Sequence, residues 1–463
     1  MPRKQHRRDF IKTTAAVGAG FWVAGGVTAK ASLSANEEIR FGCIGIDGKG
    51  SSDSSDAKEH GKVVAICDID EASLGKAESA FPGAKKFNDY RKLLEEMDKS
   101  IDAVTVSVPD HMHAVIASQA MKMGKHCFCQ KPLTHSIEEA RILGNIAREK
   151  NLVTQMGNQG TAMSNLRLSS ALIKNGIAGT VKEAHVWTNR PVWPQSKGLK
   201  VKIKPDAGAE KEWETAKAKV HWDLWVGCAK NHPYSPEIHP FKWRGLWAFG
   251  TGALGDMACH TFNMAYMALN LRNPTTVKAT GDGHDGVMYP KSSVIEFEFP
   301  EDNGRPAIKV FWYDGGQLPP AELLKDLPKQ NTDKGDVPFD SAALIIGDKG
   351  KFYSPGDYGG DVGNTGLIVD GEFQNQRTIG KDVEYVRSPG HFTEFANGIK
   401  GEGTPMSNFP DYSGPLTETI LLGNLAVWSG EKITWDAKTM TAAGATDGVK
   451  KMIRHDYLNG YSL

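Results

Sequence analysis

The sequence predicts an α/β protein whose N-terminal domain is a doubly wound parallel sheet. Over residues 37–160, short β-rich runs alternate with helical patterns, as they do in βαβ units. The turn Gly45-Ile46-Asp47-Gly48-Lys49-Gly50 directly follows the first β-rich run. Asp68 ends the second run, 23 residues after Gly45. Together these three observations are typical of a Rossmann domain.

The elements of this domain can be placed in order along the chain. We expect strands at residues 39–44, 62–67, 101–108 and 126–129, and helices at 71–80, 111–123 and 137–150. Ser136 and Glu139 form a capping box that starts the last of these helices. Because helices separate consecutive strands, the strands are expected to pair in parallel and to end at one common edge.

Residues 161–463 are expected to form a second α/β domain. Strand-like runs at 181–187, 293–299 and 307–312 predict a mixed or antiparallel sheet. Residues 314–365 are rich in Gly, Pro, Asp and Lys, which predicts a long loop with little regular structure. The apolar helical pattern at 416–428 predicts a helix that packs back on the Rossmann domain.

Composition and charge exclude several functional classes. The 463 residues include 55 basic and 55 acidic side chains. Residues 1–31 carry six bases and one acid, which leaves 49 bases, 54 acids and a net charge of −5 on the remainder. This mildly acidic body argues against a nucleic-acid partner. Six cysteines over this length exclude a disulfide scaffold, and their spacing predicts no metal site.

The N-terminus predicts an export signal. Arg7 and Arg8 form a twin-arginine pair, followed by two apolar residues and Lys12. Residues 13–29 are uncharged and contain four glycines, so this stretch is too short and too Gly-rich to span a membrane comfortably. Ala29-Lys30-Ala31 offers a cleavage site. We therefore expect residues 1–31 to be a twin-arginine signal, which places the protein in the periplasm with no membrane span after its removal. The alternative is a basic, disordered tail.

The glycine turn departs from the usual pattern at one position. Asp47 occupies the second glycine of G-x-G-x-x-G, where it adds bulk and negative charge next to a dinucleotide's pyrophosphate, and Gly48 partly compensates. Asp68 can accept hydrogen bonds from both ribose hydroxyls and would repel a 2′-phosphate, which favours NAD over NADP. The alternative is a structural turn that binds no nucleotide.

Two further strand ends are expected at the cofactor edge. Val108-Pro109-Asp110-His111 closes the third strand, and we expect Pro109 and His111 to lie near the nucleotide. Gln130-Lys131-Pro132 closes the fourth, where the proline favours a turn that aims Lys131 across the edge. The alternative for Lys131 is a solvated loop lysine.

A second group of candidate residues follows a glycine-rich run at 250–255. Asp256 and His260 are four residues apart and therefore share one helix face. A carboxylate next to an imidazole stabilises its protonated form and orients it, and a histidine with a pKa near neutral could handle the proton of a sugar hydroxyl together with a lysine. The alternative is a pair that braces the helix.

Seven of the eleven tryptophans fall between Trp187 and Trp247. Tryptophans usually pack in a core, but they also supply flat faces that stack on pyranose rings. Trp193 and the pair Trp243-Arg244 lie in loop-like sequence, so we place them at the rim of a substrate site.

These motifs make the chain resemble the Gfo/Idh/MocA oxidoreductase family. The resemblance covers nearly all of the chain after the signal and rests on residues 45–50, Asp68, 108–111, 124–126, 130–132, Gln155-Met156-Gly157-Asn158-Gln159, Gly255-Asp256-x3-His260 and 456–461. It implies a Rossmann domain followed by an α/β domain with a large open, mostly antiparallel sheet, often used for dimer or tetramer contacts. It also implies that Ile46, Gln130 and Asn158 help to bind the cofactor.

The resemblance also implies catalytic roles. His260 would be the main acid/base on the reacting hydroxyl, Lys131 would bridge that hydroxyl and the nicotinamide ribose, and Asp256 would orient His260. Three departures from the family pattern are Asp47 for glycine, Gln130 for the usual Glu, and Asn263 for an acid often found three residues after the His.

The expected location shapes the functional hypothesis. Free NAD is scarce in a periplasm, so an enzyme exported in folded form would keep its cofactor bound and recycle it in the site. Our first hypothesis is an oxidoreductase that acts in this way on a sugar or glycoside hydroxyl. The second is an NAD-dependent glycosidase that works by transient oxidation and elimination. The third is a carbohydrate-binding relative without catalysis, in which Asp47 marks a lost cofactor site.

Overall fold

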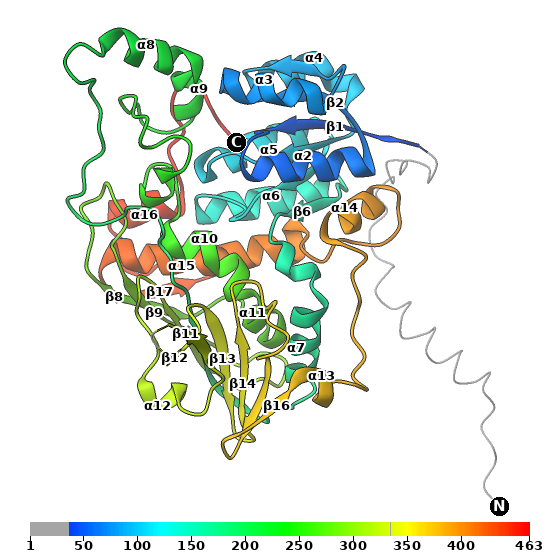
Figure 1. Ribbon diagram of the computed structural model, residues 1–463, viewed down its shortest axis with the longest axis vertical. Helices are drawn as coiled ribbons and strands as arrows, with labels where there is room; N and C mark the ends of the chain where they lie inside the picture. Colours follow the sequence, from blue (N-terminus) through cyan, green and yellow to red (C-terminus); the bar gives the residue numbers. More distant parts are fainter. Residues whose placement is uncertain (1–36, 334) are drawn as a thin grey trace, which may run out of the picture. The chain divides into compact units, whose positions relative to one another are not determined.

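The N-terminal domain is a six-stranded parallel sheet with helices between its strands (Figure 1). The computed structural model describes residues 37–333 and 335–463, so the predicted export signal at 1–31 lies outside the described residues. The strands are β1 (Ile39–Ile44), β2 (Gly61–Cys67), β3 (Lys85–Phe87), β4 (Ala103–Val106), β5 (His126–Cys129) and β6 (Thr154–Met156). Their order, β3-β2-β1-β4-β5-β6, confirms the predicted Rossmann-type sheet.

Helices α2 (Lys49–His60), α3 (Glu71–Ala80), α4 (Tyr90–Met97), α5 (Asp110–Lys122) and α6 (Ile137–Glu149) join these strands. Local sequence explains where several of them start. The side chains of Asp70 and Asp89 accept backbone N–H groups at the starts of α3 and α4, and at the start of α6 the Glu139 carboxylate accepts the backbone N–H of Ser136 at 2.8 Å. These caps satisfy backbone N–H groups at the helix starts and so fix where each helix begins.

The second sheet has ten strands in the order β16-β15-β14-β13-β7-β10-β9-β8-β17-β18. They are β7 (Val181–Trp187), β8 (Thr276–Gly281), β9 (Ser293–Phe299), β10 (Ile308–Tyr313), β13 (Ala342–Gly347), β14 (Lys351–Pro355), β15 (Gly366–Val369), β16 (Glu372–Asn375), β17 (Ile433–Asp436) and β18 (Thr441–Ala442). Among these neighbours only β7 and β10 pair in parallel. The predicted large, mostly antiparallel sheet is therefore confirmed.

The prediction of an irregular loop at 314–365 is wrong. This region contains α12 (Ala321–Leu324), the hairpin of β11 (Gln330–Thr332) and β12 (Gly335–Val337), and the sheet strands β13 and β14. β13 pairs antiparallel with β7, where Ala343 faces Val186, and with β14, where Leu344 faces Tyr353. Because the β7 partner lies more than 150 positions earlier in the chain, the local Gly- and Pro-rich composition could not show this pairing.

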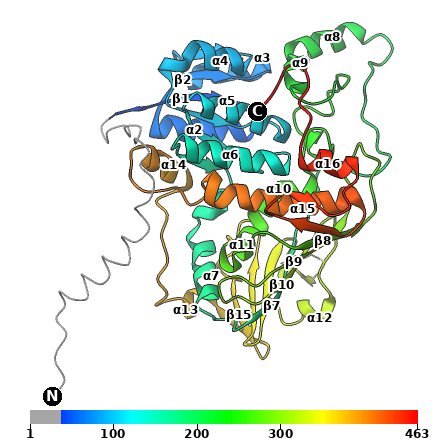
Figure 2. The same ribbon diagram turned by 180° about the vertical axis from the view of Figure 1, so that it is seen from behind.

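Helix α15 (Gly414–Ser429) lies between the helices of the N-terminal domain and the second sheet (Figure 2). It packs against α6 on one side and against α10 (Gly252–Thr261), β8 and β9 on the other. Arg141 on α6 donates two hydrogen bonds to the Glu418 carboxylate, at 2.8 and 2.6 Å. A Cβ at Gly423 would lie 2.5 Å from Leu254 and 2.9 Å from Phe297, so a glycine allows this close approach.

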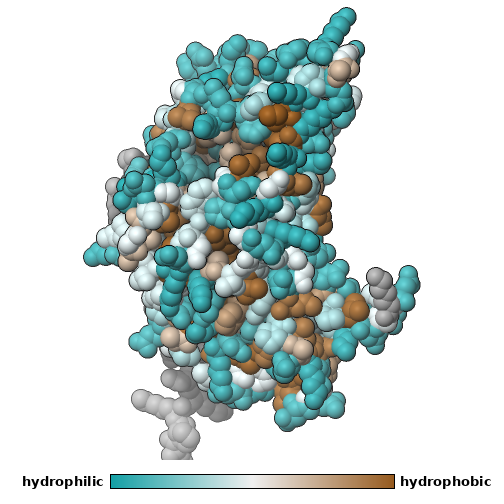
Figure 3. All heavy atoms as spheres, turned by 90° about the vertical axis from the view of Figure 1, so that its left-hand side faces the viewer, coloured by the Kyte–Doolittle hydropathy of each residue, from teal (hydrophilic) through white to brown (hydrophobic). Residues whose placement is uncertain are grey.

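Between β7 and α10 runs a tryptophan-rich segment, which we define as residues 189–250. It contains α8 (Glu210–Lys219), α9 (Trp222–Val226) and the short helix η3 (Lys242–Gly245). Trp222 and Trp225 stack with ring centroids 4.5 Å apart in a small core of their own. The segment reaches the loop after β2, since His221 Nε2 lies 2.7 Å from Glu71 and His239 Nε2 lies 3.4 Å from Asp70. In Figure 3, apolar surface lies among hydrophilic residues on the side of α8 and α9.

The remaining elements are η1 (Asp98–Ser100), η2 (Gln159–Ala162), α7 (Ser164–Lys174), α11 (Asn263–Leu269), α13 (Gln376–Ile379), α14 (His391–Ile399), η4 (Phe409–Ser413) and α16 (Asp447–Ile453). No helix within 37–333 or 335–463 is long and apolar enough to cross a membrane. All six cysteines of the chain are unpaired and buried, and burial raises the pKa of each thiol.

Candidate functional site

The glycine turn lies directly against the end of β4. Gly45 has φ +76°, and a Cβ there would lie 2.2 Å from the carbonyl oxygen of Ser107. A Cβ at Gly50 would lie 2.1 Å from the carbonyl oxygen of Gly45. Gly48 has φ +55° and stands just before α2, whose first turn receives no side-chain cap. The structure therefore has a tight backbone cradle at a helix N-terminus, which is the geometry that binds a pyrophosphate.

The carboxylate of Asp47 is bound by residues of its own turn and of α3. It accepts the N–H of Gly48 at 2.7 Å and the hydroxyl of Ser73 at 3.0 Å, and Lys76 Nζ lies 3.6 Å away. The Gly48 hydrogen bond has the largest effect and lowers the pKa of Asp47. Burial opposes it, Ser73 and Lys76 each lower the pKa by a smaller amount, and the pKa stays below its usual value. The negative charge at this glycine position is thus exposed and partly balanced by a lysine.

Asp68 lies beside the same turn at the end of β2. Its Oδ2 accepts the N–H of Ile46 at 3.0 Å, and its Oδ1 accepts the N–H of Asp70 at 2.9 Å. Burial raises the pKa of this carboxyl group, against the two backbone hydrogen bonds. Each oxygen keeps a second lone pair, so the group can still accept ribose hydroxyls. The predicted cofactor residues Gly45, Gly48, Gly50 and Asp68 are therefore brought together.

Lys131 and Asp256 meet across the two domains. Lys131 Nζ, in the loop after β5, donates to Oδ1 and to the backbone oxygen of Asp256 on α10, both at 2.7 Å. Arg244 Nε lies 3.5 Å from the same Oδ1. Burial is the largest influence and raises the pKa of Asp256, but the positive charges of Lys131 and Arg244 outweigh it and hold the pKa below its usual value. Asp256 is therefore an ionised carboxylate between two cations.

His260 follows one turn later on α10. Its side chain is buried, its Nδ1 has no hydrogen-bond partner among the described residues, and its ring meets the edge of Tyr358 at 4.6 Å between centroids. Burial first, then the charge of Lys131, lowers the pKa of His260 well below its usual value. The imidazole is thus neutral at neutral pH and able to accept a proton.

The expectation that Asp256 orients a protonated His260 needs correction. Within the described part of the chain no hydrogen bond joins the two side chains, because the Asp256 carboxylate is engaged by Lys131 and Arg244. The negative charge of Asp256 does favour protonation of His260, but burial and Lys131 have larger effects on its pKa. Asp256 instead holds Lys131.

The sequence reasoning missed Asp53, which lies fully buried on α2. It accepts hydrogen bonds from Lys49 at 2.7 Å, from Ser107 at 2.7 Å and from Gln130 at 2.8 Å. Gln130 in turn receives the N–H of Lys131 on its Oε1 at 3.3 Å. Asp53 therefore links the glycine-turn helix to the loop that carries Lys131. An aspartate in a Ser-rich helix gives no local signal of such a role.

Asp110 is a second missed carboxyl group. It starts α5, is buried, and accepts the hydroxyl of Thr251 at 2.6 Å. Burial raises its pKa to about 7, although Lys131 and Arg244 are near enough to oppose this shift. Its neighbours Pro109 and His111 were predicted as site residues, so the same motif could have indicated Asp110.

Two predicted cofactor residues turn their polar atoms toward other parts of the protein. The His111 ring packs between Trp225 and Phe249, its Nε2 lies 3.1 Å from the Trp225 carbonyl oxygen, and burial lowers its pKa to about 4. Asn158 is buried, accepts the hydroxyl of Ser407, and donates to the backbone of α10. Pro109 precedes α5, at the carboxyl edge of the parallel sheet.

The predicted aromatic rim is wrong in its placement. Trp193 and Trp243 are 4% and 7% exposed, so neither offers a ring face at a surface. Trp193 donates its indole N–H to Gln195 at 2.8 Å, and Trp243 donates to the Pro240 carbonyl at 3.0 Å. The guanidinium of Arg244 lies 4.4 Å from the Trp243 ring centroid, so this tryptophan supports the arginine that faces Asp256.

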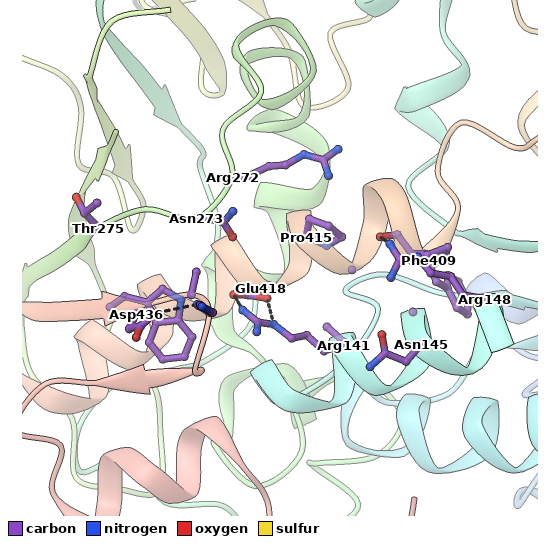
Figure 4. Close-up of a pocket in the computed structure, with 17 residues that line it drawn as sticks. Arg141, Asn145, Arg148, Arg272, Asn273, Thr275, Phe409, Pro415, Glu418 and Asp436 are labelled. Atoms are coloured by element: carbon purple, nitrogen blue, oxygen red, sulfur yellow. Dashed lines mark hydrogen bonds and ion pairs between the residues drawn. The ribbon is translucent and has the colours of Figure 1, made fainter. Parts of the chain in front are cut away.

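A separate cavity of about 730 Å³ lies between α6, α15 and β17 (Figure 4). Arg141 and Glu418 form its ion pair, and Arg148 and Arg272 also line it. None of its lining residues belongs to the predicted site. In the part of the chain that the structure describes, no group of three or more His, Cys, Asp or Glu side chains is arranged to hold a metal ion.

Comparison with protein families gives two matches. Residues 39–158 match the model of an oxidoreductase family with an NAD-binding Rossmann fold, Gfo/Idh/MocA. Residues 184–288 match the model of the C-terminal α/β domain of the same family. The two matched ranges contain Lys131, Asp256 and His260.

Two curated relatives have names that describe carbohydrate-active enzymes. A levoglucosan dehydrogenase from Pseudarthrobacter phenanthrenivorans is 28% identical over 179 residues, which cover 38% of this chain and 35% of the relative. An alpha-N-acetylgalactosaminidase from Shewanella oneidensis is 29% identical over 208 residues, covering 38% of this chain and 44% of the relative. The matches span about a third of the length of the first curated relatives.

Solved structures share the fold at low identity. The WlbA dehydrogenase from Bordetella pertussis, solved with NADH and UDP-GlcNAcA, has a TM-score of 0.57 at 16% identity and covers 86% of this chain and 99% of its own. An aldose-aldose oxidoreductase from Caulobacter crescentus, solved with glycerol, has a TM-score of 0.53 at 12% identity and covers 86% of this chain and 100% of its own. At these identities the likeness shows the fold alone.

Proposed function

We propose that this chain, whose two family matches support the Gfo/Idh/MocA oxidoreductase family, is an NAD-dependent enzyme that oxidises a hydroxyl of a sugar or glycoside. The observation that carries the proposal is the contact of Lys131 with Asp256 at the carboxyl edge of the parallel sheet. It lies one helical turn from a neutral His260 whose Nδ1 has no partner among the described residues. A lysine hydrogen-bond donor and an imidazole proton acceptor at one place are suited to alcohol oxidation.

The residues around the glycine turn fit a dinucleotide. The Gly45 and Gly50 positions admit no Cβ, and the uncapped start of α2 offers N–H groups to a pyrophosphate. Asp68 would accept the ribose hydroxyls, and its negative charge favours NAD over NADP. A nicotinamide cofactor, when bound, supplies the hydride acceptor.

The side chains then divide the proton chemistry. Oxidation of a secondary hydroxyl removes a proton from oxygen and a hydride from carbon. His260 accepts the proton, because its lowered pKa keeps the imidazole neutral. Lys131 donates a hydrogen bond to the oxygen as negative charge develops there, and Asp256 fixes the ammonium group for this purpose. Arg244 supports Asp256 from the other side.

We further propose that the cofactor stays bound and is recycled in the site, as the export signal expected from the sequence would require. The periplasmic location is part of this proposal. A second candidate is a glycosidase that oxidises its substrate transiently, eliminates the aglycone and restores the hydroxyl, and the match to the Shewanella oneidensis alpha-N-acetylgalactosaminidase favours it. We also expect a homodimer or homotetramer that uses the open sheet.

The test is to denature purified protein and to assay the supernatant for nicotinamide nucleotide. About one NAD(H) per chain would support a resident cofactor. The native protein is then incubated with glycosides. A keto product supports the oxidoreductase, whereas free sugar without keto product supports the glycosidase. A chain that neither releases nucleotide nor binds added NAD would overturn both in favour of carbohydrate binding without catalysis.

A further inference from the structure

The loop between β14 and β15, residues 356–365, lies against α10, the helix that carries Asp256 and His260. The ring of Tyr358 meets His260 edge-on at 4.6 Å between centroids, and the hydroxyl of Thr261 donates to the backbone oxygen of Asp357 at 3.3 Å. A Cβ at Gly160 would lie 3.3 Å from the Tyr358 carbonyl oxygen, so the loop also touches η2. This loop is in the region that sequence composition assigned to irregular structure.

Asp357 in this loop is held at one oxygen only. Arg190, just after β7, donates to Oδ2 at 3.3 Å, and both side chains are 21% exposed. The other oxygen, Oδ1, is buried and has no hydrogen-bond partner among the described residues. A buried carboxylate oxygen without a donor is unfavourable unless a ligand or water supplies one.

Three polar atoms on residues at or beside this loop lack a partner among the described residues. Oδ1 of Asp357 belongs to the loop, Nδ1 of His260 belongs to a ring that contacts Tyr358, and Oε1 of Gln159 belongs to the residue before Gly160, which approaches Tyr358. The oxygens of Asp357 and Gln159 are acceptors, so they call for hydroxyl donors. Hydroxyl groups on adjacent carbons of a sugar ring provide several donors within a few ångströms.

We propose that Asp357 accepts a hydrogen bond from a hydroxyl of the substrate and that Arg190 positions it, so that the site selects a neutral sugar ring over an anionic one. This rests on the proposed function and names the substrate class for the same site. The free lone pairs of Asp357 Oδ1 accept a hydrogen bond from a sugar hydroxyl, whereas an ionised carboxylate of the substrate has no hydrogen to donate at this point.

The test measures binding rather than turnover. Purified full-length protein with its resident nucleotide is titrated calorimetrically with methyl glucoside, galactoside and mannoside and with the matching methyl uronates. We expect a neutral sugar to bind more tightly than its uronate. Asp357→Asn is expected to weaken the best neutral sugar about 10- to 100-fold, with unchanged nucleotide content. Asp370→Asn is the matched control, because Asp370 is exposed, lies in a turn at φ +51° that asparagine tolerates, and should bind like the wild type.

Monodeoxy analogues of the best sugar separate recognition from support of the loop. The wild type should lose affinity for one analogue by about the factor that Asp357→Asn costs, and the variant should no longer distinguish that analogue from the parent sugar. An equal loss for every analogue, or binding within twofold of the wild type, overturns the proposal. So does a wild type that binds none of the panel or prefers the uronates.

A crystal structure of the wild type with the best sugar gives the same answer without a substitution. A sugar hydroxyl within about 3.2 Å of Asp357 Oδ1 supports the proposal, and a sugar placed elsewhere contradicts it. Because these readouts do not need turnover, a protein that binds sugar through Asp357 without oxidising it would overturn the oxidoreductase function alone. A redox-active protein indifferent to Asp357→Asn would overturn this inference alone.

Discussion

Three side chains in the candidate site have different electrostatic roles. The pKa of Asp256 is held low by two cations, so this group is ionised. The pKa of His260 is lowered by burial and by Lys131, and burial raises the pKa of Asp110 toward neutral pH. Lys131 thus lowers the pKa of both groups, which disfavours the protonated form of His260 and favours the ionised form of Asp256. The site separates the groups that hold a proton from those that do not, which is the arrangement expected for acid–base chemistry.

Lys131→Met should remove the hydrogen-bond donor to the reacting oxygen. We expect turnover to fall by about 100-fold or more while most of the nucleotide stays bound, because the glycine turn and Asp68 are not altered. Initial rates with the best glycoside, together with nucleotide released on denaturation, measure both effects. Lys122→Met, on the exposed side of α5, is the control. Unchanged turnover in Lys131→Met would reject its catalytic role.

Asp110→Asn should change how stability depends on pH. In the unfolded chain Asp110 loses its proton near its ordinary pKa, whereas in the folded protein the raised pKa keeps the proton until about pH 7. The wild type therefore loses stability as pH rises from about 4 to 7, by up to a few kcal/mol. The asparagine of the variant cannot ionise and can still accept the Thr251 hydroxyl.

The melting temperatures of the two proteins, measured from pH 4 to 8, test this expectation. The advantage of Asp110→Asn should grow up to about pH 7 and then level off, because the raised pKa of Asp110 means that the folded wild type also loses the proton there. A constant difference across the range would contradict a buried, protonated Asp110.

Sequence patterns predicted those site residues whose roles depend on local spacing. Gly45, Gly50 and Asp68 stand at fixed distances around one turn, and Lys131 lies in the loop that follows β5 at the expected edge. Asp53 and Asp357 could not be predicted, because their partners Gln130 and Arg190 lie 77 and 167 positions away. The Trp193 and Trp243 rings were misplaced because loop-like sequence does not reveal burial.

At the scale of elements, the glycine turn is the most constrained part of the site. Gly50→Ala would place a Cβ 2.1 Å from the Gly45 carbonyl oxygen, so α2 must move away from the turn. We expect a loss of about 2 kcal/mol or more in unfolding free energy and loss of bound nucleotide.

Gly75→Ala is the matched control for this substitution. Gly75 lies within α3 with open space around its Cβ position, so alanine should be neutral or stabilise by about 0.5–1 kcal/mol. Chemical unfolding and nucleotide release compare the two variants. Similar behaviour of both would mean that the close approach at Gly50 does not matter.

Strand and helix prediction succeeded where apolar runs are long and bounded by clear turns. β1, β5, β7 and β9 have the expected bounds, as does α3. Between 314 and 365 the strands are short and separated by turn residues, and their stability comes from pairing with β7. Such non-local pairing leaves little trace in local composition.

At the scale of the whole molecule, the tryptophan-rich segment joins the second domain to the loop after Asp68. His221 contacts Glu71, and His239 approaches Asp70, both next to the residue expected to bind the adenosine ribose. These contacts would slow the release of a bound nucleotide. We expect the double variant His221→Ala/His239→Ala to release nucleotide about 3- to 10-fold faster on dialysis, since each exposed or half-buried pair contributes little alone.

Lys219→Ala, on the exposed end of α8, is the control for that experiment and should release nucleotide at the wild-type rate. Equal release from the double variant would mean that these contacts do not retain the cofactor.

The burial of every thiol makes the molecule convenient for spectroscopy. Thiolates react with maleimide dyes, and the six native cysteines are inaccessible and have raised pKa values. A cysteine introduced at Val192, which is 63% exposed, would therefore be labelled selectively without first removing the native ones. With a second dye site on α3, energy transfer between the fluorophores could follow in real time whether the tryptophan-rich segment moves as ligands come and go.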